Sequence, residues 1–584
     1  MSSYKALKEA FVSDTSGSTI THVNLISLAA LLSVTLYSAL KTRAGIFRTL
    51  VNASSLIDFI LQWALLVLPL LLSMTVFAKQ PLYLNVTLFL PLLALLRMQA
   101  PRQGTMLPMA STLASSAKTQ RAPSFAPLPA LTTYRAHMML MTVLAILAVD
   151  FPAFPRELAK CETFGVSLMD LGVGSFVFSQ GVVSAIPILK NPYYINSPFL
   201  PKLWSTTKKS LPIIILGVIR VLLVKGIEYP EHVTEYGVHW NFFITLALLP
   251  IFQAILHPVL KNVSISTVGV ILGTLQQILL SKSFLSYVIH EPRSASLFSK
   301  NKEGLVSLLG YLSIHILGLS TGILVLPPSP GFFRRRQKLL LDTSTKSTTP
   351  TNLPSLSSAR QTDKTATELC AYSIMWWAAV GAVGWIDASG AVSRRLVNLR
   401  YILWIAAFNT SFLLSYLVVV DMWISKPSSV KIEKDSHDDP DSGAEESPAD
   451  MDLTPAGRAE KVEKARIEIE KLRLKERESV RRRVKERERE NSLAVDEHTA
   501  STHTPGAESK SSIHEVTSGN PPKLLDIINR HGLLVFLGAN VLTGLVNLTI
   551  ETMYVSDGWA IAVLSAYSLV VCGGGWVYDA YRRQ

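Results

Sequence analysis

The chain has 584 residues, of which 49% are hydrophobic and only 17% are charged, and its mean hydropathy is +0.31. No soluble core of ordinary size needs so many long apolar runs, so the composition argues against a soluble globular protein. The formal net charge is +13, but no aromatic and basic module of the kind that binds nucleic acid accompanies it. In a membrane protein such an excess usually reflects positive cytosolic loops, and we expect no nucleic-acid partner.

Apolar stretches long enough to cross roughly 30 Å of hydrocarbon recur along the chain. They predict an all-α, polytopic membrane protein with about thirteen spans. The predicted spans lie near residues 22–41, 55–75, 82–97, 136–150, 165–188, 211–225, 238–258, 264–284, 304–326, 368–387, 400–424, 532–551 and 558–579. The polar N-terminus lacks the layout of a cleaved signal, so the first span is expected to act as its own membrane signal.

The loops between these spans predict an orientation and a domain organisation. Lys and Arg are more frequent in the loops that are cytosolic if the N-terminus is lumenal, and an odd number of spans then leaves the C-terminus in the cytosol. Residues 1–424 are expected to form a core of eleven spans with lumenal catalytic loops. Residues 425–523 read as a charged, largely disordered cytosolic insert. Residues 524–584 contain the last two spans.

The segment from Asp150 to Ser184 is the first candidate for chemistry. Charged residues crowd here between two membrane-length segments, where they need a polar cavity. Asp150 closes a helix at its C-terminal end, where the helix dipole disfavours a negative charge, and this suits a general base. Lys160 follows across a turn broken by prolines and could stabilise an oxyanion or neutralise a phosphate. A surface pair of Glu157 with Lys160 explains the same spacing, and spacing alone does not decide between the two.

A second group of polar residues precedes the predicted span at 238–258. It contains Glu231, His232, His239, Trp240 and Asn241. A histidine here could move a proton or contact a sugar hydroxyl. The spacing matches no zinc pattern, and we predict no metal site. The alternative is that these side chains only anchor a helix at the membrane interface.

Two further loops and one pair of intramembrane charges complete the candidates. Asn301 with Lys302, and the Arg394, Arg395 and Asn398 loop, are typical of anion-contact loops, although basic residues at helix ends also meet lipid headgroups.

Asp170 and Arg220 fall at similar depth in adjacent predicted spans, which predicts a structural ion pair. Cys161 has no histidine near it in the loop, and this favours a packing role over a nucleophile.

Several of these segments resemble a known family. They are FPRELAKCETFGVSLMDLGVGSFVF, VKGIEYPEHVTEYGVHWNFFITLALLP, NKEGLVSLLGYL, SRRLVNLRYILW, NVLTGLVNLTIET and the opening YKALKEAFVSDTSGSTI. The sequence is similar over nearly its whole length to the Gwt/PIG-W family of inositol acyltransferases of GPI-anchor biosynthesis in the endoplasmic reticulum. The family pattern of thirteen spans with a lumenal N-terminus is similar to the predicted one.

The resemblance implies transfer of a long-chain acyl group, typically palmitoyl, from acyl-CoA to the inositol 2-hydroxyl of glucosaminyl-phosphatidylinositol. It implies catalytic roles for Asp150 and Lys160, with acyl-CoA as co-substrate and no other cofactor. Residues expected to contact the glycan and phosphate are Arg156, Glu231, His232, His239, Trp240, Asn241, Asn301, Lys302, Arg394, Arg395 and Asn398. The alternatives are a lipid transporter or flippase, in which Asp170 and Arg220 carry substrate, and a non-catalytic subunit of a lipid-modifying complex.

Overall fold

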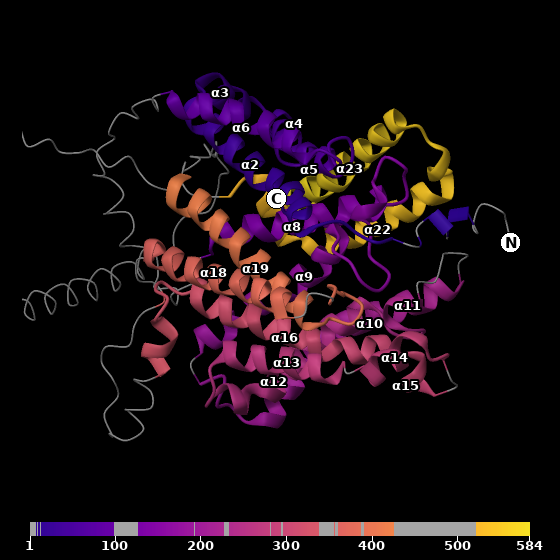
Figure 1. Ribbon diagram of the computed structural model, residues 1–584. Helices are drawn as coiled ribbons and strands as arrows, with labels where there is room; N and C mark the ends of the chain where they lie inside the picture. Colours follow the sequence, from indigo (N-terminus) through magenta and orange to yellow (C-terminus); the bar gives the residue numbers. More distant parts are fainter. Residues whose placement is uncertain are drawn as a thin grey trace, which may run out of the picture. The chain divides into compact units, whose positions relative to one another are not determined.

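The computed structural model describes residues 7–8, 10–11, 13, 15–98, 127–191, 193–226, 233–280, 282–293, 296–337, 356, 360–386, 390–424 and 521–583. Within these ranges the chain is helical and has no β-strand, which confirms the predicted all-α class (Figure 1). One isolated antiparallel bridge joins Ser18 to Val166. The predicted insert at 425–523 lies almost wholly outside the described residues, so its disorder stays a prediction.

Ten described helices are long and apolar enough to cross a membrane, and the bent pair α13 and α14 would make an eleventh span. They are α2 (Ile20–Arg43), α4 with α5 (Ser55–Leu66 and Leu68–Met74), α8 (Pro129–Ala148), α9 (Leu168–Lys190), α12 (Phe242–Leu260), α16 (Lys302–Val325), α18 (Thr362–Ile386), α19 with a π-helical continuation (Leu399–Tyr416 and Leu417–Ile424), α22 (Gly532–Thr549) and α23 (Asp557–Arg583). The multi-pass prediction is confirmed, whereas the count of thirteen is not.

The remaining helices are shorter or more polar. They are α3 (Gly45–Ala53), α6 (Pro81–Arg97), α10 (Phe199–Gly226), α11 (Val233–Tyr236), α13 (Ile265–Leu279), α14 (Lys282–His290), α15 (Leu297–Lys300) and α21 (Lys523–Arg530). Three of the predicted spans fall on helices of this group. The span at 82–97 is α6, an apolar helix of only 17 residues, and the span at 211–225 is the second half of the long α10. The span at 264–284 covers α13 and the start of α14, which are bent relative to each other.

Helices α9 and α16 pack at very close range in the middle of the bundle. A Cβ atom added at Gly181 of α9 would collide with the carbonyl oxygen of His315, and one added at Gly318 of α16 would collide with that of Phe178. Because lipid tails are as apolar as leucine, helices in a membrane gain association energy from such close backbone approach. The glycines therefore fix α16 against α9, and with it the loops at the ends of both helices.

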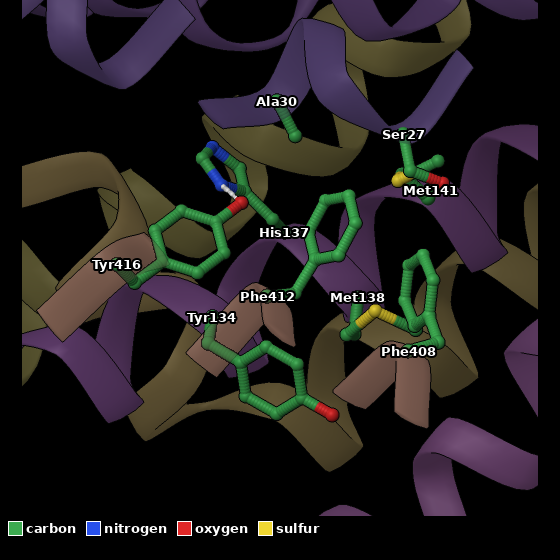
Figure 2. Close-up of a pocket in the computed structure, with 9 residues that line it drawn as sticks. All are labelled: Ser27, Ala30, Tyr134, His137, Met138, Met141, Phe408, Phe412 and Tyr416. Atoms are coloured by element: carbon green, nitrogen blue, oxygen red, sulfur yellow. Dashed lines mark hydrogen bonds between the residues drawn. The ribbon is translucent and has the colours of Figure 1, made fainter. Parts of the chain in front are cut away.

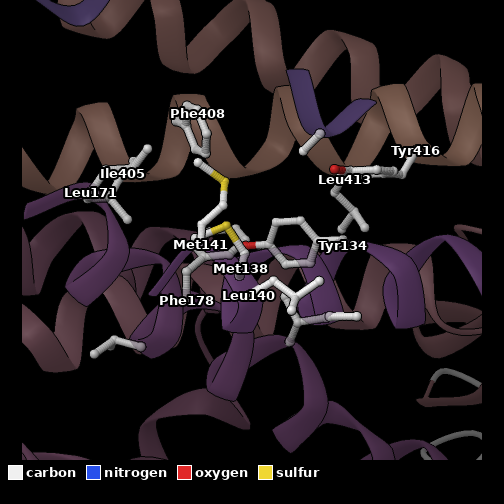
Figure 3. Packing of buried hydrophobic residues seen from close by; sticks show 14 of the residues in the cluster. Tyr134, Met138, Leu140, Met141, Leu171, Phe178, Ile405, Phe408, Leu413 and Tyr416 are labelled. Carbon is white, nitrogen blue, oxygen red and sulfur yellow. The ribbon is translucent and has the colours of Figure 1, made fainter. Parts of the chain in front are cut away.

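Helix α8 packs against α9 and α19 through buried side chains. Figure 3 shows Met138 of α8 beside Phe408 of α19, with Tyr416 further along the same face. The Tyr134 hydroxyl donates a hydrogen bond to the Asn409 side chain between the two helices. This polar contact inside an apolar interface fixes α8, whose C-terminal end carries the predicted reactive loop.

The helices that follow the insert return to the N-terminal part of the bundle. The backbone N–H of Leu524 donates to the Gln62 side chain at 2.8 Å, and Trp63 Nε1 donates to the hydroxyl of Ser568 at 3.0 Å. In Figure 1 the yellow α23 lies beside the indigo α5. Residues 517–584 thus belong to the same compact unit as residues 1–427.

Candidate functional site

The loop that joins α8 to α9 is a folded structure and not an extended linker. Phe151, Phe154 and Leu158 are fully buried and anchor it to the helices. Pro152 lies four residues after the end of α8 and disfavours its continuation, and a turn of 3-10 helix spans Arg156–Leu158 directly after Pro155. The loop therefore holds the charged side chains at its two ends, Asp150 and Lys160, in defined places.

Arg156 organises this loop from its centre. Its Nη2 donates to the carbonyl oxygens of Val149 at 2.8 Å and Phe154 at 2.9 Å, and its guanidinium lies 4.1 Å from the ring centroid of Phe11. Burial lowers the pKa of Arg156 to about 10, and the nearby Asp150 carboxylate opposes this shift, so the group stays cationic at neutral pH. Its Nε and Nη1 are buried and have no hydrogen-bond partner among the described residues.

The Asp150 carboxylate is only 4% exposed and has two partners that the sequence analysis missed. Lys8 Nζ lies 3.3 Å from its Oδ1, and Asn547 Nδ2 donates to its Oδ2 at 2.8 Å. Lys8 Nζ also donates to Asn547 Oδ1 at 2.7 Å, so the three side chains form a closed ring of polar contacts. Both partners lie in segments that resemble the family, YKALKEAFVSDTSGSTI and NVLTGLVNLTIET, but no spacing rule connects them to Asp150.

The segment before α2 crosses over the loop that joins α8 to α9. The Thr15 hydroxyl donates to the carbonyl oxygen of Lys160, and the backbone N–H of Ser18 donates to the carbonyl oxygen of Val166 at 2.6 Å. Gly17 adopts a φ of +80°, and a Cβ there would collide with Val166. A glycine is thus needed where this segment passes the loop.

Lys160 begins a chain of alternating charges that leads into the protein. Its Nζ lies 3.0 Å from Glu235 Oε1, the same oxygen lies 3.0 Å from Arg394 Nη2, and Arg394 Nε lies 2.6 Å from Asp170 Oδ1. The side chains are 39% exposed at Lys160, 18% at Glu235, 2% at Arg394 and 1% at Asp170. The chain therefore connects a buried ion pair to an ammonium at the surface.

The predicted ion pair of Asp170 with Arg220 is wrong. Asp170 pairs with Arg394, and its Oδ2 also accepts the backbone N–H of Cys161 at 3.0 Å. Arg220 is exposed and lies 5.9 Å from the ring centroid of Phe243. The prediction failed because similar depth in two spans does not fix which faces of the helices meet, whereas Arg394 reaches Asp170 from a loop.

A second ionic cluster surrounds Glu303 at the start of α16. Arg293 lies 2.7 Å and Arg395 lies 3.2 Å from its Oε1. Lys302 is 2% exposed, and its Nζ donates to the carbonyl oxygens of Tyr287 at 3.0 Å and Glu291 at 2.6 Å. Arg395 and Lys302, both predicted as substrate contacts, therefore have protein partners here.

The predicted asparagine contacts hold helix ends and loops. Asn241 caps α12 by accepting the backbone N–H of Phe243 at 3.0 Å, and Asn398 caps α19 by accepting that of Tyr401 at 3.2 Å. Asn301 Oδ1 accepts the backbone N–H of His239 at 2.8 Å.

The aromatic residue of the same region also has a protein partner. Trp240 Nε1 donates to the Thr245 hydroxyl at 2.9 Å. The predicted contacts Glu231 and His232 lie outside the described residues. The substrate roles of this group therefore stay predictions.

Asp150 and Lys160 do not form an ion pair with each other. The carboxylate contacts Lys8 and Asn547, and the ammonium contacts Glu235. Cys161 is 3% exposed, and burial, followed by the charge of Asp170, raises the pKa of its thiol to about 12. The thiol is therefore protonated at neutral pH and unsuited to nucleophilic attack. Within the described ranges, no three His, Cys, Asp or Glu side chains are grouped as metal ligands.

An apolar groove of about 360 Å³ lies between the first turns of α2 and the helices α18 and α19. Its lining residues are Thr21, Asn24, Leu25, Leu28, Trp377, Phe408, Ser411 and Phe412. A second cavity, shown in Figure 2 and also lined by Phe408 and Phe412, has room for about one water beside the hydrogen-bonded pair of His137 and Tyr416. Of these two spaces, only the groove has a volume that could hold part of a lipid chain.

Comparison with known proteins agrees with these features. The sequence model of the GWT1 family matches residues 4–460 and 488–578. The chain is 36% identical to GPI-anchored wall transfer protein 1 of Aspergillus fumigatus, over 98% of this chain and 96% of that protein. It is 35% identical to the protein of that name from Aspergillus oryzae (99% and 98% covered) and 36% identical to that from Saccharomyces cerevisiae (71% and 83% covered). This chain, with its multi-pass helical core and its folded loop after α8, belongs to the GWT1 family.

Proposed function

We propose that this chain acts in GPI-anchor biosynthesis as an acyltransferase. It moves a long-chain acyl group, typically palmitoyl, from acyl-CoA to the inositol 2-hydroxyl of glucosaminyl-phosphatidylinositol. The relatives are named for GPI-anchored wall transfer, which supports a GPI-related role, and the resemblance of the loop motifs supports inositol acylation. The proposed location is the endoplasmic reticulum membrane, with a lumenal N-terminus and a cytosolic C-terminus.

The proposal is carried by the environment of the Asp150 carboxylate. This group is 4% exposed, lies directly after a membrane-spanning helix and is held by partners from two distant segments. A general base needs a fixed carboxylate within hydrogen-bond reach of the hydroxyl whose proton it removes. Asp150 is such a fixed carboxylate. Because it directly follows a membrane-spanning helix, it would lie at the depth of a lipid headgroup.

In the proposed mechanism Asp150 accepts the proton of the inositol 2-hydroxyl as the oxygen attacks the thioester carbonyl. The new C–O bond forms, the C–S bond breaks, and the proton passes to the departing CoA thiolate. Lys160, which is 39% exposed at its side chain, stabilises the negative charge that develops on the carbonyl oxygen or the sulfur. Direct transfer needs no acyl-enzyme, in keeping with a Cys161 thiol whose pKa burial raises to about 12.

Two features support lipid and phosphate binding near this loop. The buried guanidinium of Arg156 keeps Nε and Nη1 without a described partner, and these donors suit a phosphate oxygen. The groove between α2, α18 and α19 is apolar and starts at the end of α2 that follows Ser18, the residue bridged to Val166. We infer that one tail of the lipid substrate occupies this groove.

The transporter alternative lost its main support. It required Asp170 and Arg220 to line a path for substrate together, but Asp170 pairs with the buried Arg394, and Arg220 is exposed. A flippase would also move lipid across a bilayer without forming a new ester.

The direct test uses the purified full chain in liposomes with palmitoyl-CoA and synthetic glucosaminyl-phosphatidylinositol. Mass spectrometry should detect a product heavier by one palmitoyl group on the inositol. Asp150→Asn should reduce its formation by about 100-fold or more, because it removes a general base while keeping the shape of the side chain. Lipid movement without any acylated product would contradict the proposal.

The matched control is Glu157→Gln. Glu157 is a partly buried carboxylate in the same loop, seven positions along the chain from Asp150. Its neutralisation should leave acylation within about twofold of the wild type, as for a residue away from a reacting group. Equal losses in both variants would contradict a specific role for Asp150.

A further inference from the structure

We propose that Lys8 and Asn547 are positioning residues that hold the Asp150 carboxylate in a fixed orientation as the base. The inference rests on the proposed function and deepens it, since it identifies which groups prepare the base. Lys8 precedes the first membrane span and Asn547 lies near the end of α22, so neither belongs to the loop that carries Asp150.

The three side chains satisfy one another in a closed arrangement. The ammonium of Lys8 contacts Asp150 Oδ1 at 3.3 Å and Asn547 Oδ1 at 2.7 Å, while the Asn547 amide donates to Asp150 Oδ2 at 2.8 Å. Each carboxylate oxygen thus has one partner and keeps further lone pairs for a substrate hydroxyl. The Asn547 amide is also oriented, because its oxygen and its nitrogen meet different groups.

This arrangement fixes the direction of the carboxylate. The Lys8 side chain is 12% exposed and that of Asp150 is 5% exposed, so solvent screens their attraction only weakly. Contacts from two distant segments, one on each oxygen, limit rotation of the carboxylate, so that it is aligned before a substrate hydroxyl arrives. The charged groups that face Asp150 are Lys8 and, from its own loop, Arg156.

The proposal also explains why the N-terminal segment crosses the reactive loop. Lys8 contacts Asp150 at one end of the loop, Phe11 lies under Arg156 at its centre, and the Thr15 hydroxyl donates to the carbonyl oxygen of Lys160 at the other end. Lys8 is the one residue of these contacts that brings a charge to the carboxylate. The segment therefore covers the loop and also supplies a residue that positions the base.

The test measures kcat and KM of acyl transfer for the full chain in liposomes. Lys8→Met keeps the apolar stem and removes the contact to the carboxylate. It should lower kcat about tenfold, because the carboxylate loses one of the two contacts that align it with the substrate hydroxyl. KM for both substrates should stay within about twofold, and Lys8→Arg, which keeps a cationic donor, should recover most of kcat.

Asn547→Leu tests the second contact independently of the first. It removes the amide donor at similar size and should lower kcat about tenfold, since the carboxylate loses one fixed hydrogen bond. If Lys8→Met does not fold into a monodisperse membrane protein, Asn547→Leu decides the question alone. Lys79→Met serves as the control, because Lys79 is an exposed lysine next to Ala78, which bonds His22 of α2 at the same end of the bundle.

The possible outcomes separate this inference from the proposed function. Wild-type protein without acyl transfer contradicts the proposed function itself. Wild-type activity together with an unchanged kcat in both Lys8→Met and Asn547→Leu contradicts only the positioning role. A loss of kcat in Lys8→Met that Lys8→Arg does not rescue, accompanied by a lower melting temperature, assigns Lys8 to folding and also overturns the inference.

Discussion

The two ends of the reactive loop are built differently. At one end Asp150 is nearly buried and is held by neutral and cationic groups from both extremes of the chain, Lys8 and Asn547. At the other end Lys160 is 39% exposed and is joined through Glu235 to an ion pair in the interior. The Asp150 end is fixed by a closed set of contacts, whereas the cationic end is attached through Glu235 to the buried pair and remains partly exposed.

This difference matches what each group would have to do. A general base must be aligned with one hydroxyl before the reaction begins, which favours a rigid and desolvated setting. A cation that stabilises charge developing on a bulky thioester must follow the substrate into place. The interior pair of Arg394 with Asp170 then acts as the foundation for the Lys160 end, to which Glu235 joins it.

The largest effect is expected where this foundation is removed. Arg394→Met leaves the Asp170 carboxylate buried without its cation, and breaking a buried ion pair in this way costs about 3–5 kcal/mol. We expect a large fall in the melting temperature of the purified protein and loss of acylation. Arg220→Met is the control, because Arg220 is exposed and unpaired with Asp170. A greater loss of stability in Arg220→Met than in Arg394→Met would support the predicted pairing of Asp170 with Arg220 instead.

A smaller loss, confined to activity, is expected when Lys160 is replaced. Lys160→Met should reduce kcat by about 100-fold while the melting temperature stays close to that of the wild type, since the side chain is 39% exposed. Lys160→Arg should recover part of the rate because the positive charge is kept. A Lys160→Met enzyme with full activity would leave the cationic end without a catalytic role.

A still smaller effect is expected when Glu235, which joins Lys160 to Arg394, is neutralised. Glu235→Gln keeps the hydrogen bonds to Arg394 and Lys160 possible but weakens their attraction, so we expect a three- to tenfold fall in kcat/KM. Folding should persist, because Asp170 still pairs with Arg394. Substrate titrations of Glu235→Gln and Lys160→Met side by side would test this order, and a greater loss in Glu235→Gln would reverse it.

Much of the architecture could be predicted from hydrophobic length alone. The helical class, the multi-pass character and the position of the loop after α8 follow from apolar runs and prolines, which are local signals. The count of spans could not, because α6 is short and α13 and α14 are bent at a break of a few residues. Hydropathy measures apolar length, but a bend depends on how the helix packs.

The candidate site was only partly accessible from the sequence for the same reason. The crowding of charge around Asp150 and Lys160 marked the loop, but its partners Lys8, Glu235 and Asn547 lie up to several hundred residues away along the chain. Depth in the membrane suggested Arg220 for Asp170, whereas the true partner, Arg394, comes from a loop. Pairings of this kind depend on tertiary packing, which no spacing rule in a single sequence contains.

The smallest effect is expected at Cys161, which lies beside Lys160 and decides whether the cationic end also supplies a nucleophile. Burial, then Asp170, raises the pKa of this thiol to about 12, so it is almost fully protonated at neutral pH. It should then hold about a thousandfold less thiolate than a free cysteine, and a water-soluble alkylating reagent should label a short cysteine peptide long before Cys161 of the folded protein. Cys161→Ser should keep acylation within about twofold, because direct transfer forms no acyl-cysteine. Loss of activity in this variant, with a palmitoyl group found on Cys161 of the wild type, would instead make the loop a carrier of the acyl chain and move the chemistry from the Asp150 end to the Lys160 end.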